Sequence, residues 1–78
     1  MTTTETVLLW INNVEPMYKH WTDQARRLDA HQLAAALKDY YVYANNPLNN
    51  DASVYSDLLK AALLSVDWQS IAADLKGI

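Results

Sequence analysis

The sequence contains no cysteine, and only one glycine and two prolines occur among its 78 residues. Without cysteine the chain can form neither a disulfide nor a thiolate metal site or redox motif, and it is unlike the small secreted scaffolds that depend on disulfides. Tight β-hairpin turns usually need glycine, so the shortage of turn residues argues against a sheet protein. Together with the many alanines and leucines, it predicts a helical chain.

Long apolar runs and clustered positive charge are also missing. No run approaches the roughly 20 apolar residues that cross a membrane, and the first residues, MTTTETVLL, lack the basic start of a signal peptide. Nine acids against six dispersed bases give a formal net charge of −3, whereas nucleic-acid binding rests on clustered Lys and Arg. We therefore expect a cytoplasmic protein that binds neither membrane nor nucleic acid.

Core-forming residues, in contrast, are plentiful: hydrophobic residues make up 51% of the chain, which has three Trp and five Tyr. A chain this short buries only about 60% of the surface of its unfolded state, so this supply suits a small core without a covalent staple. We expect one domain over residues 1–78, with an all-α fold that forms a compact bundle of four to five short helices.

The first third of the chain has apolar residues at alternating steps of four and three, the period of one helical face. The stripe consists of Val7, Ile11, Val14, Tyr18, Trp21, Ala25 and Leu28. Pro16 interrupts it, and proline in a helix interior costs about 3 kcal/mol. The pattern fits one kinked helix, or two helices with Asn13 as the second N-cap and Pro16 in its first turn. We favour a break or sharp kink between Asn12 and Glu15.

Three further stripes indicate the remaining helices. Their expected inward residues are Leu33, Ala36, Leu37, Tyr40 and Ala44, with Tyr41 beside them; then Tyr55, Leu58, Leu59, Ala62 and Leu63; and finally Trp68, Ile71, Ala72 and Leu75. Trp21 and Trp68, each on its apolar stripe, are predicted to be core residues.

Capping residues set the expected helix boundaries. Asp29 and Gln32 form a capping-box pattern before a helix that should end near Asn45. The segment NNPLNNDAS is expected to be a loop, because asparagine side chains compete with helical hydrogen bonds and proline lacks the donor. Asp51 or Ser53 should then cap the next helix. The last helix should begin at the cap Asp67 and stop at Gly77.

The last residues, SVDWQSIAADLKGI, resemble the start of a helix-turn-helix unit. A DNA reader needs a second helix in the major groove and basic residues on the phosphates. No residues follow for that helix, and Lys76 is the only base among the last 18 residues. We interpret this segment as a closing core helix.

No arrangement of reactive side chains points to catalysis or metal binding. His20 and His31 lie eleven positions apart and lack the close pairing of zinc ligands. The sequence has no nucleophile elbow and no glycine-rich phosphate loop. The acids are scattered near bases, as with Asp57 and Lys60, which is typical of a solvated helix face. We predict no enzyme activity, no catalytic residue, no cofactor and no metal.

The aromatic residues give the candidate contact site. Trp10 and Tyr43 fall off the main stripes, and Tyr40 and Tyr41 accompany Tyr43. Exposed Trp and Tyr are enriched at protein interfaces; alternatively, a small domain wraps its core with large rings whose polar tips reach water. Trp10, Tyr40, Tyr41 and Tyr43 are the candidate partner-binding residues.

These observations favour a small non-enzymatic protein-interaction module, a monomer or weak homodimer that binds another protein. The alternative is an acidic DNA mimic of the antirestriction type, which needs acids aligned on one face at phosphate-like spacing.

Two segments resemble an uncharacterised family of small phage, plasmid and bacterial proteins. The matching residues near the start are Leu9, Trp10, Ile11, Asn13, Glu15, Tyr18 and Trp21, and those near the end are Tyr55, Asp57, Leu58, Leu59, Ala62, Leu63, Val66, Trp68, Ile71, Ala72 and Leu75. The resemblance covers about half of the chain. It departs from the family where Pro16 replaces an expected glycine and where an aromatic leader is missing. It implies a small host- or phage-encoded protein and carries over no functional residue.

Overall fold

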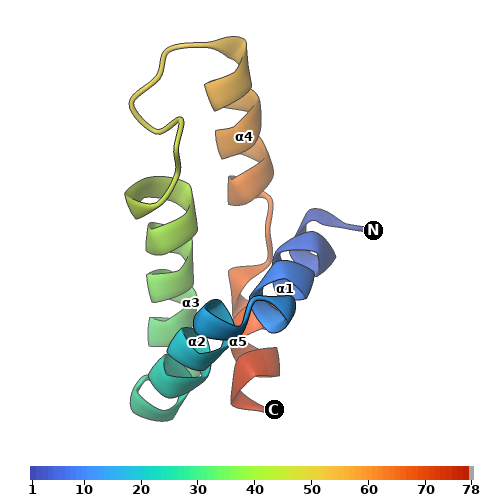
Figure 1. Ribbon diagram of the computed structural model, residues 1–78, viewed down its shortest axis with the longest axis vertical. Coiled ribbons are helices and arrows are strands. Elements are labelled where there is room, and N and C mark those ends of the chain that lie inside the picture. Colours follow the sequence, from blue (N-terminus) through green and yellow to red (C-terminus); the bar gives the residue numbers. More distant parts are fainter. Residues whose placement is uncertain (78) are drawn as a thin grey trace.

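In the computed structural model, which describes residues 1–77, a series of helices is joined by short connections, except for the long loop over residues 45–53 (Figure 1). The elements are α1 (Thr3–Asn13), α2 (Glu15–Arg27), α3 (Ala30–Lys38), the π-helical segment η1 (Asp39–Ala44), α4 (Val54–Leu64) and α5 (Trp68–Lys76). Residues 1–77 contain no strand, so the predicted all-α bundle of four to five helices is confirmed. Ile78, which the single-domain prediction includes, lies outside the described residues. Within that same range, no helix has the length and apolarity needed to cross a bilayer.

Side-chain caps begin four of the five α-helices. Capping boxes are formed by Thr2 with Glu5, by Asp29 with Gln32 and by Ser53 with Ser56. The Asp67 carboxylate accepts from the N–H of Ser70 at 3.0 Å. Each cap satisfies an amide that the first turn leaves without a partner. The predicted caps at Asp29, Ser53 and Asp67 are thus confirmed, and so is the stop at Gly77, whose φ of 76° lies in the left-handed region that favours glycine.

The chain breaks between α1 and α2 instead of kinking. Val14 is both the last cap of α1 and the N-cap of α2, with extended dihedrals (φ −104°, ψ 104°). Pro16 lies in the first turn of α2, where its missing N–H would have no helical partner in any case. The predicted break is therefore confirmed, but Asn13 as its N-cap is wrong: Asn13 is still helical, and the cap at Val14 has no side-chain hydrogen bond.

The break also changes which residues face the core. Ile11 on α1 and Trp21 and Ala25 on α2 are buried as predicted, whereas Val14 and Tyr18 are exposed. The predicted stripe assumes a constant helical period, but the extended backbone at Val14 turns the start of α2 away from that phase. Both side chains therefore lie on the outside of the bend.

The helix predicted to begin after Asp29 and end near Asn45 starts as α3 and continues as π-helix from Asp39 onward. Its last hydrogen bond runs from the N–H of Asn45 to the carbonyl of Tyr40, five residues back, at 2.8 Å. The wider turn shifts the inward positions: Val42, five residues after Leu37, is fully buried, whereas the predicted Ala44 is exposed. The end near Asn45 is confirmed, and the π-helical winding is what the sequence pattern missed.

The core lies between α3 and α5, the most extensively packed pair of helices. Leu33 and Leu37 of α3 and Ile71 of α5 are completely buried. Trp21 and Trp68 are also buried, which confirms both as core residues. The ring of Tyr41 stacks on that of Trp68, with centroids 5.8 Å apart and planes 9° apart.

α4 departs most from its prediction. Its main packing partner is η1, and Figure 1 shows it, in orange, standing beside the upper end of the green α3–η1 column. Of its predicted inward residues, Leu59 and Leu63 are half-buried, but Tyr55, Leu58 and Ala62 are exposed. The apolar stripe is real, but the rest of residues 1–77 covers only its Leu59 and Leu63 side and leaves Tyr55, Leu58 and Ala62 open.

Candidate functional site

The four predicted contact residues do not form one site. Trp10 lies on α1 and is 65% exposed, while Tyr43 lies on η1 and is 46% exposed. The off-stripe positions of these two therefore indicated exposure correctly. Tyr40 and Tyr41, also on η1, are half-buried and pack against the core.

Tyr41 belongs to the core network. Its hydroxyl accepts a hydrogen bond from Nε1 of the buried Trp21 at 3.2 Å, and its ring stacks on Trp68. Burial raises the pKa of Tyr41 above its ordinary value of 10.0, because the tyrosinate would lose its hydration. The side chain therefore holds α2, η1 and α5 together, and little of it is free for a partner.

We expect Tyr41→Phe to lower the free energy of unfolding by about 1–2 kcal/mol at neutral pH, because the buried Trp21 N–H loses its acceptor. The difference in unfolding free energy between wild type and the variant should shrink at alkaline pH. A raised folded-state pKa means that the native form resists ionisation. The contribution of this hydroxyl to the free energy of unfolding is therefore fully present below pH 10 and is lost as pH rises through the folded pKa. The variant lacks that titration. Urea unfolding at neutral and at alkaline pH measures both effects; an unchanged gap between the two proteins would contradict the burial of this hydroxyl.

Tyr43 joins η1 to α4 through a cation–π contact. The Lys60 ammonium lies 5.8 Å from the centroid of the Tyr43 ring, within the range over which such attraction acts. This contact turns Lys60 towards η1 and away from the opposite side of α4.

Four apolar side chains lie exposed around the bend between α1 and α2: Leu9, Trp10, Val14 and Tyr18, here called the elbow surface. The N–H of Val14 donates to the carbonyl of Trp10, and that of Tyr18 to the carbonyl of Val14, at 3.1 and 2.9 Å. These bonds fix the backbone spacing of the three side chains through the bend. Of the four, the sequence pattern indicates only Trp10 as a contact residue, because Val14 and Tyr18 lie on the predicted apolar stripe.

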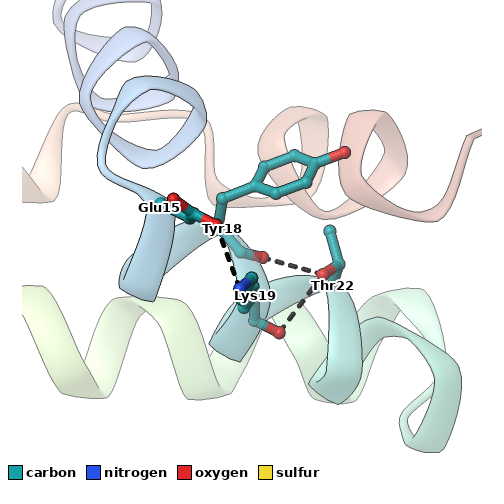
Figure 2. A network of polar contacts seen from close by, with 4 residues as sticks. All are labelled: Glu15, Tyr18, Lys19 and Thr22. Carbon is teal, nitrogen blue, oxygen red and sulfur yellow. Dashed lines mark hydrogen bonds and ion pairs between the residues drawn. The ribbon is translucent and has the colours of Figure 1, made fainter.

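Local polar contacts hold the α2 side of the elbow in shape (Figure 2). Lys19 and Glu15 form an exposed ion pair at 3.0 Å, and the Thr22 hydroxyl donates to the carbonyls of Tyr18 and Lys19. Figure 2 shows the Tyr18 ring extending away from the charged pair. The ring is therefore presented to solvent by the start of α2 and takes no part in these polar contacts itself.

A second exposed apolar surface lies on α4. We call it the α4 outer face; it consists of Val54, Tyr55, Leu58, Ala61 and Ala62. Apolar residues occur on nearly all sides of this helix, and that feature of the sequence could have signalled two apolar surfaces, one for η1 and one left open. An apolar hollow of about 240 Å³ separates α4 from the start of α1, with Met1, Val7, Leu59 and Ala62 among its walls.

The acidic side chains are spread over the molecule and mostly serve local structure. Six of the nine acids are engaged within their own segment: Glu15 and Asp23 in ion pairs, Glu5, Asp29 and Asp67 at helix starts, and Asp51 as the acceptor of the Ser53 hydroxyl. The N–H and hydroxyl of Thr2 lower the pKa of Glu5 through hydrogen bonds to its carboxylate.

The histidines lie apart. His31 of α3 approaches the Gln69 amide of α5 at 3.4 Å beside a hollow of about 420 Å³, and His20 packs edge-on against Trp21. Among residues 1–77, no three His, Asp or Glu side chains gather as a metal site would require. The contacts of both histidines are structural in kind.

Neither of the two perturbed pKa values marks a reactive group, because the Glu5 shift comes from a helix cap and the Tyr41 shift from core packing.

Comparison with protein-family models, with curated proteins and with solved structures found no match to this chain, so the resemblance to a family of small phage, plasmid and bacterial proteins stays a prediction.

Proposed function

We propose that this protein is a non-enzymatic, cytoplasmic interaction module that binds another protein through the elbow surface, with Trp10 as the anchor. The observation that carries the proposal is the exposure of Trp10. Burying a tryptophan is strongly favourable, and exposed tryptophans are enriched at protein interfaces. On binding, Trp10 would lose its remaining contact with water.

The surroundings of Trp10 support this role. Leu9, Val14 and Tyr18 extend the apolar surface, and Asn12 and Asn13 are exposed polar neighbours. An apolar centre with a polar rim is the usual arrangement of a protein-binding surface. The partner should offer an apolar pocket for an indole ring, with an acceptor for its N–H.

Acidic DNA mimicry, the alternative function, has less support than protein binding. Mimicry needs an unbroken row of free carboxylates, whereas six of the nine acids already serve caps and local contacts. No feature of the geometry favours it over the elbow surface.

Trp10→Ala should weaken capture of the partner by about 30-fold or more, as expected for a hot-spot tryptophan at about 2 kcal/mol. The assay is affinity capture from the native host with wild-type and variant baits, quantified by mass spectrometry. Tyr43→Ala is the matched control, because it removes another exposed ring on a different element. The supporting result is a protein captured by wild type and by Tyr43→Ala but lost with Trp10→Ala. Equal capture by all three baits would reject the elbow surface as the contact site.

A further inference from the structure

The molecule exposes more surface than a compact monomer of its size. Its accessible surface is 5147 Å², against roughly 4800 Å² expected for a monomeric protein of 8.9 kDa. Its radius of gyration is 12.5 Å, against about 11.5 Å for 78 residues. Figure 1 shows α4 and the loop before it at one end of the longest axis of the molecule. The excess surface is thus associated with α4.

The α4 outer face has the pattern of a helix-pairing seam. Val54, Leu58 and Ala61 recur at steps of four and three, the heptad spacing of helices that pack along their length. Lys60 points to Tyr43 on η1, so the seam itself carries no charge and Asp57 lies at its edge. Such a surface suits an apolar helix as its partner.

The same surface carries both a protruding ring and a place to receive one. Tyr55, in the first turn of α4, is 72% exposed. The hollow between α1 and α4 lies beside the second half of the helix, at Ala62. Its volume of about 240 Å³ exceeds the roughly 150 Å³ of a cavity that binds benzene. The hollow can therefore receive an aromatic side chain, and Tyr55 of the same chain is not among its walls.

We propose that a second copy of this chain covers the α4 outer face, with the two α4 helices antiparallel about a two-fold axis between Leu58 and Ala61. This arrangement sets Leu58 of one helix against Ala61 of the other and Val54 against Ser65, so that large residues face small ones. The two-fold symmetry also brings Tyr55 of each copy to the flank where the other copy has its hollow. Both rings are buried at once, as an isologous interface requires.

Other arrangements of two copies use the surface less well. Parallel helices would place Tyr55 against Tyr55 and leave both hollows empty. A head-to-tail contact would fill one hollow and leave the other open, so that chains would add without closure. Of the three arrangements, only the antiparallel pair fills both hollows and covers both Tyr55 rings.

Charge at the opposite flank agrees with this pairing. Asp57 and Leu64 share one edge of α4, and the two-fold axis between Leu58 and Ala61 places Asp57 opposite Ala62 of the other copy, two residues from its Leu64. Lys38 of α3 lies on the wall of the same hollow as Leu64. Asp57 of each copy therefore meets the flank that carries Lys38 in the other copy, and the opposite charges on that flank favour the pairing.

The expected dimer is weak. α4 is about 16 Å long, and one face of such a helix supplies less than the roughly 800 Å² that each partner contributes to a standard interface. Met1, exposed on the wall of the hollow, enlarges the contact only modestly. We expect a Kd in the micromolar range. The proposal goes beyond the binding of another protein and does not depend on it, because the elbow surface lies on α1 and α2.

Sedimentation velocity from micromolar to millimolar concentration tests the association. Wild type should move from a species of 8.9 kDa to one of twice that mass. Tyr55→Ala should weaken the dimer by about 30-fold, as hot-spot tyrosines do. Leu58→Glu should abolish it, because it brings two carboxylates together near the axis, whereas the matched Leu9→Glu, on the elbow surface, should dimerise like wild type. Circular dichroism confirms that the variants stay helical; if Leu58→Glu loses its helices, Tyr55→Ala alone decides.

Single cysteines test the geometry, because the native chain has none. A disulfide needs Cα atoms about 4.4–6.8 Å apart. Ala61→Cys, beside the axis, should cross-link to itself under oxidation, and a mixture of Val54→Cys and Ser65→Cys should cross-link as a pair. Val54→Cys alone should not, because its two copies lie about 16 Å apart along the antiparallel helices. A chain that stays monomeric at millimolar concentration, a dimer that Leu9→Glu disrupts instead of Leu58→Glu, or efficient cross-linking of Val54→Cys alone would each overturn the proposal.

Discussion

Replacing Trp68 with alanine should lower the free energy of unfolding by about 3–5 kcal/mol, the usual cost of truncating a buried tryptophan. Trp68 is 6% exposed at the start of α5, and its ring stacks on Tyr41. Truncation would leave a cavity between α5 and η1 that the neighbouring helices cannot fill without moving. A domain of this size has about 4–12 kcal/mol in total, so a large part of its stability would be lost.

Urea unfolding measures this loss as a lower midpoint at an unchanged m-value. Trp10→Ala is the matched control: the same substitution at an exposed position should change stability by less than about 0.5 kcal/mol. Trp68→Phe is the second control. It keeps a ring against Tyr41 and removes the buried Nε1 donor, which has no hydrogen-bond partner within residues 1–77, so it should cost clearly less than alanine. A Trp68→Ala protein as stable as Trp10→Ala would show that the closing helix does not pack as described.

Local patterns predicted most of the helix boundaries because caps act over a few residues. Asp29 with Gln32, Ser53 and Asp67 each satisfy amides within three positions, so the sequence alone reveals them. The break before Pro16 followed from the same local chemistry. Its N-cap was misplaced by one residue because Asn is the better capping side chain, whereas Val14 caps through backbone geometry alone.

Periodicity predicted less well which apolar faces are covered. It marks an amphipathic helix but not what lies opposite, and it assumes 3.6 residues per turn throughout. The π-helical winding of η1 placed Val42 inward in place of Ala44, and the bend at Val14 left Tyr18 outside. The stripe on α4 was identified correctly, yet whether another helix of the same chain covers it depends on the tertiary arrangement of η1 and α5.

The candidate contact residues divide for the same reason. Trp10 and Tyr43 were identified from positions off the stripes, and both are exposed. Tyr41 was grouped with them from its place in the sequence, but the register of η1 brings it between Trp21 and Trp68. A tyrosine beside an apolar stripe can thus be a core residue when the helix that carries it widens.

Lys76→Met should lower the free energy of unfolding by about 2–3 kcal/mol, since hydrogen bonds to a charged group contribute more than neutral ones. The Lys76 ammonium donates to the carbonyls of Ala25 at 2.8 Å and Leu28 at 2.7 Å. These are carbonyls at the end of α2, where no helical amide remains to bind them and where the helix dipole favours a positive charge. The only base of the closing helix therefore joins α5 to α2, and it is not free for a nucleic-acid phosphate.

Methionine is the informative replacement for Lys76 because it keeps the apolar stem and removes only the ammonium. Lys19→Met is the matched control, since Lys19 forms an exposed ion pair with Glu15 whose loss should cost no more than about 0.5 kcal/mol. Urea midpoints of the two variants give the comparison. Equal stability would mean that water replaces the ammonium at both carbonyls at no cost. A clear deficit in Lys76→Met alone would establish that two hydrogen bonds spanning about two thirds of the chain hold the last helix against the second.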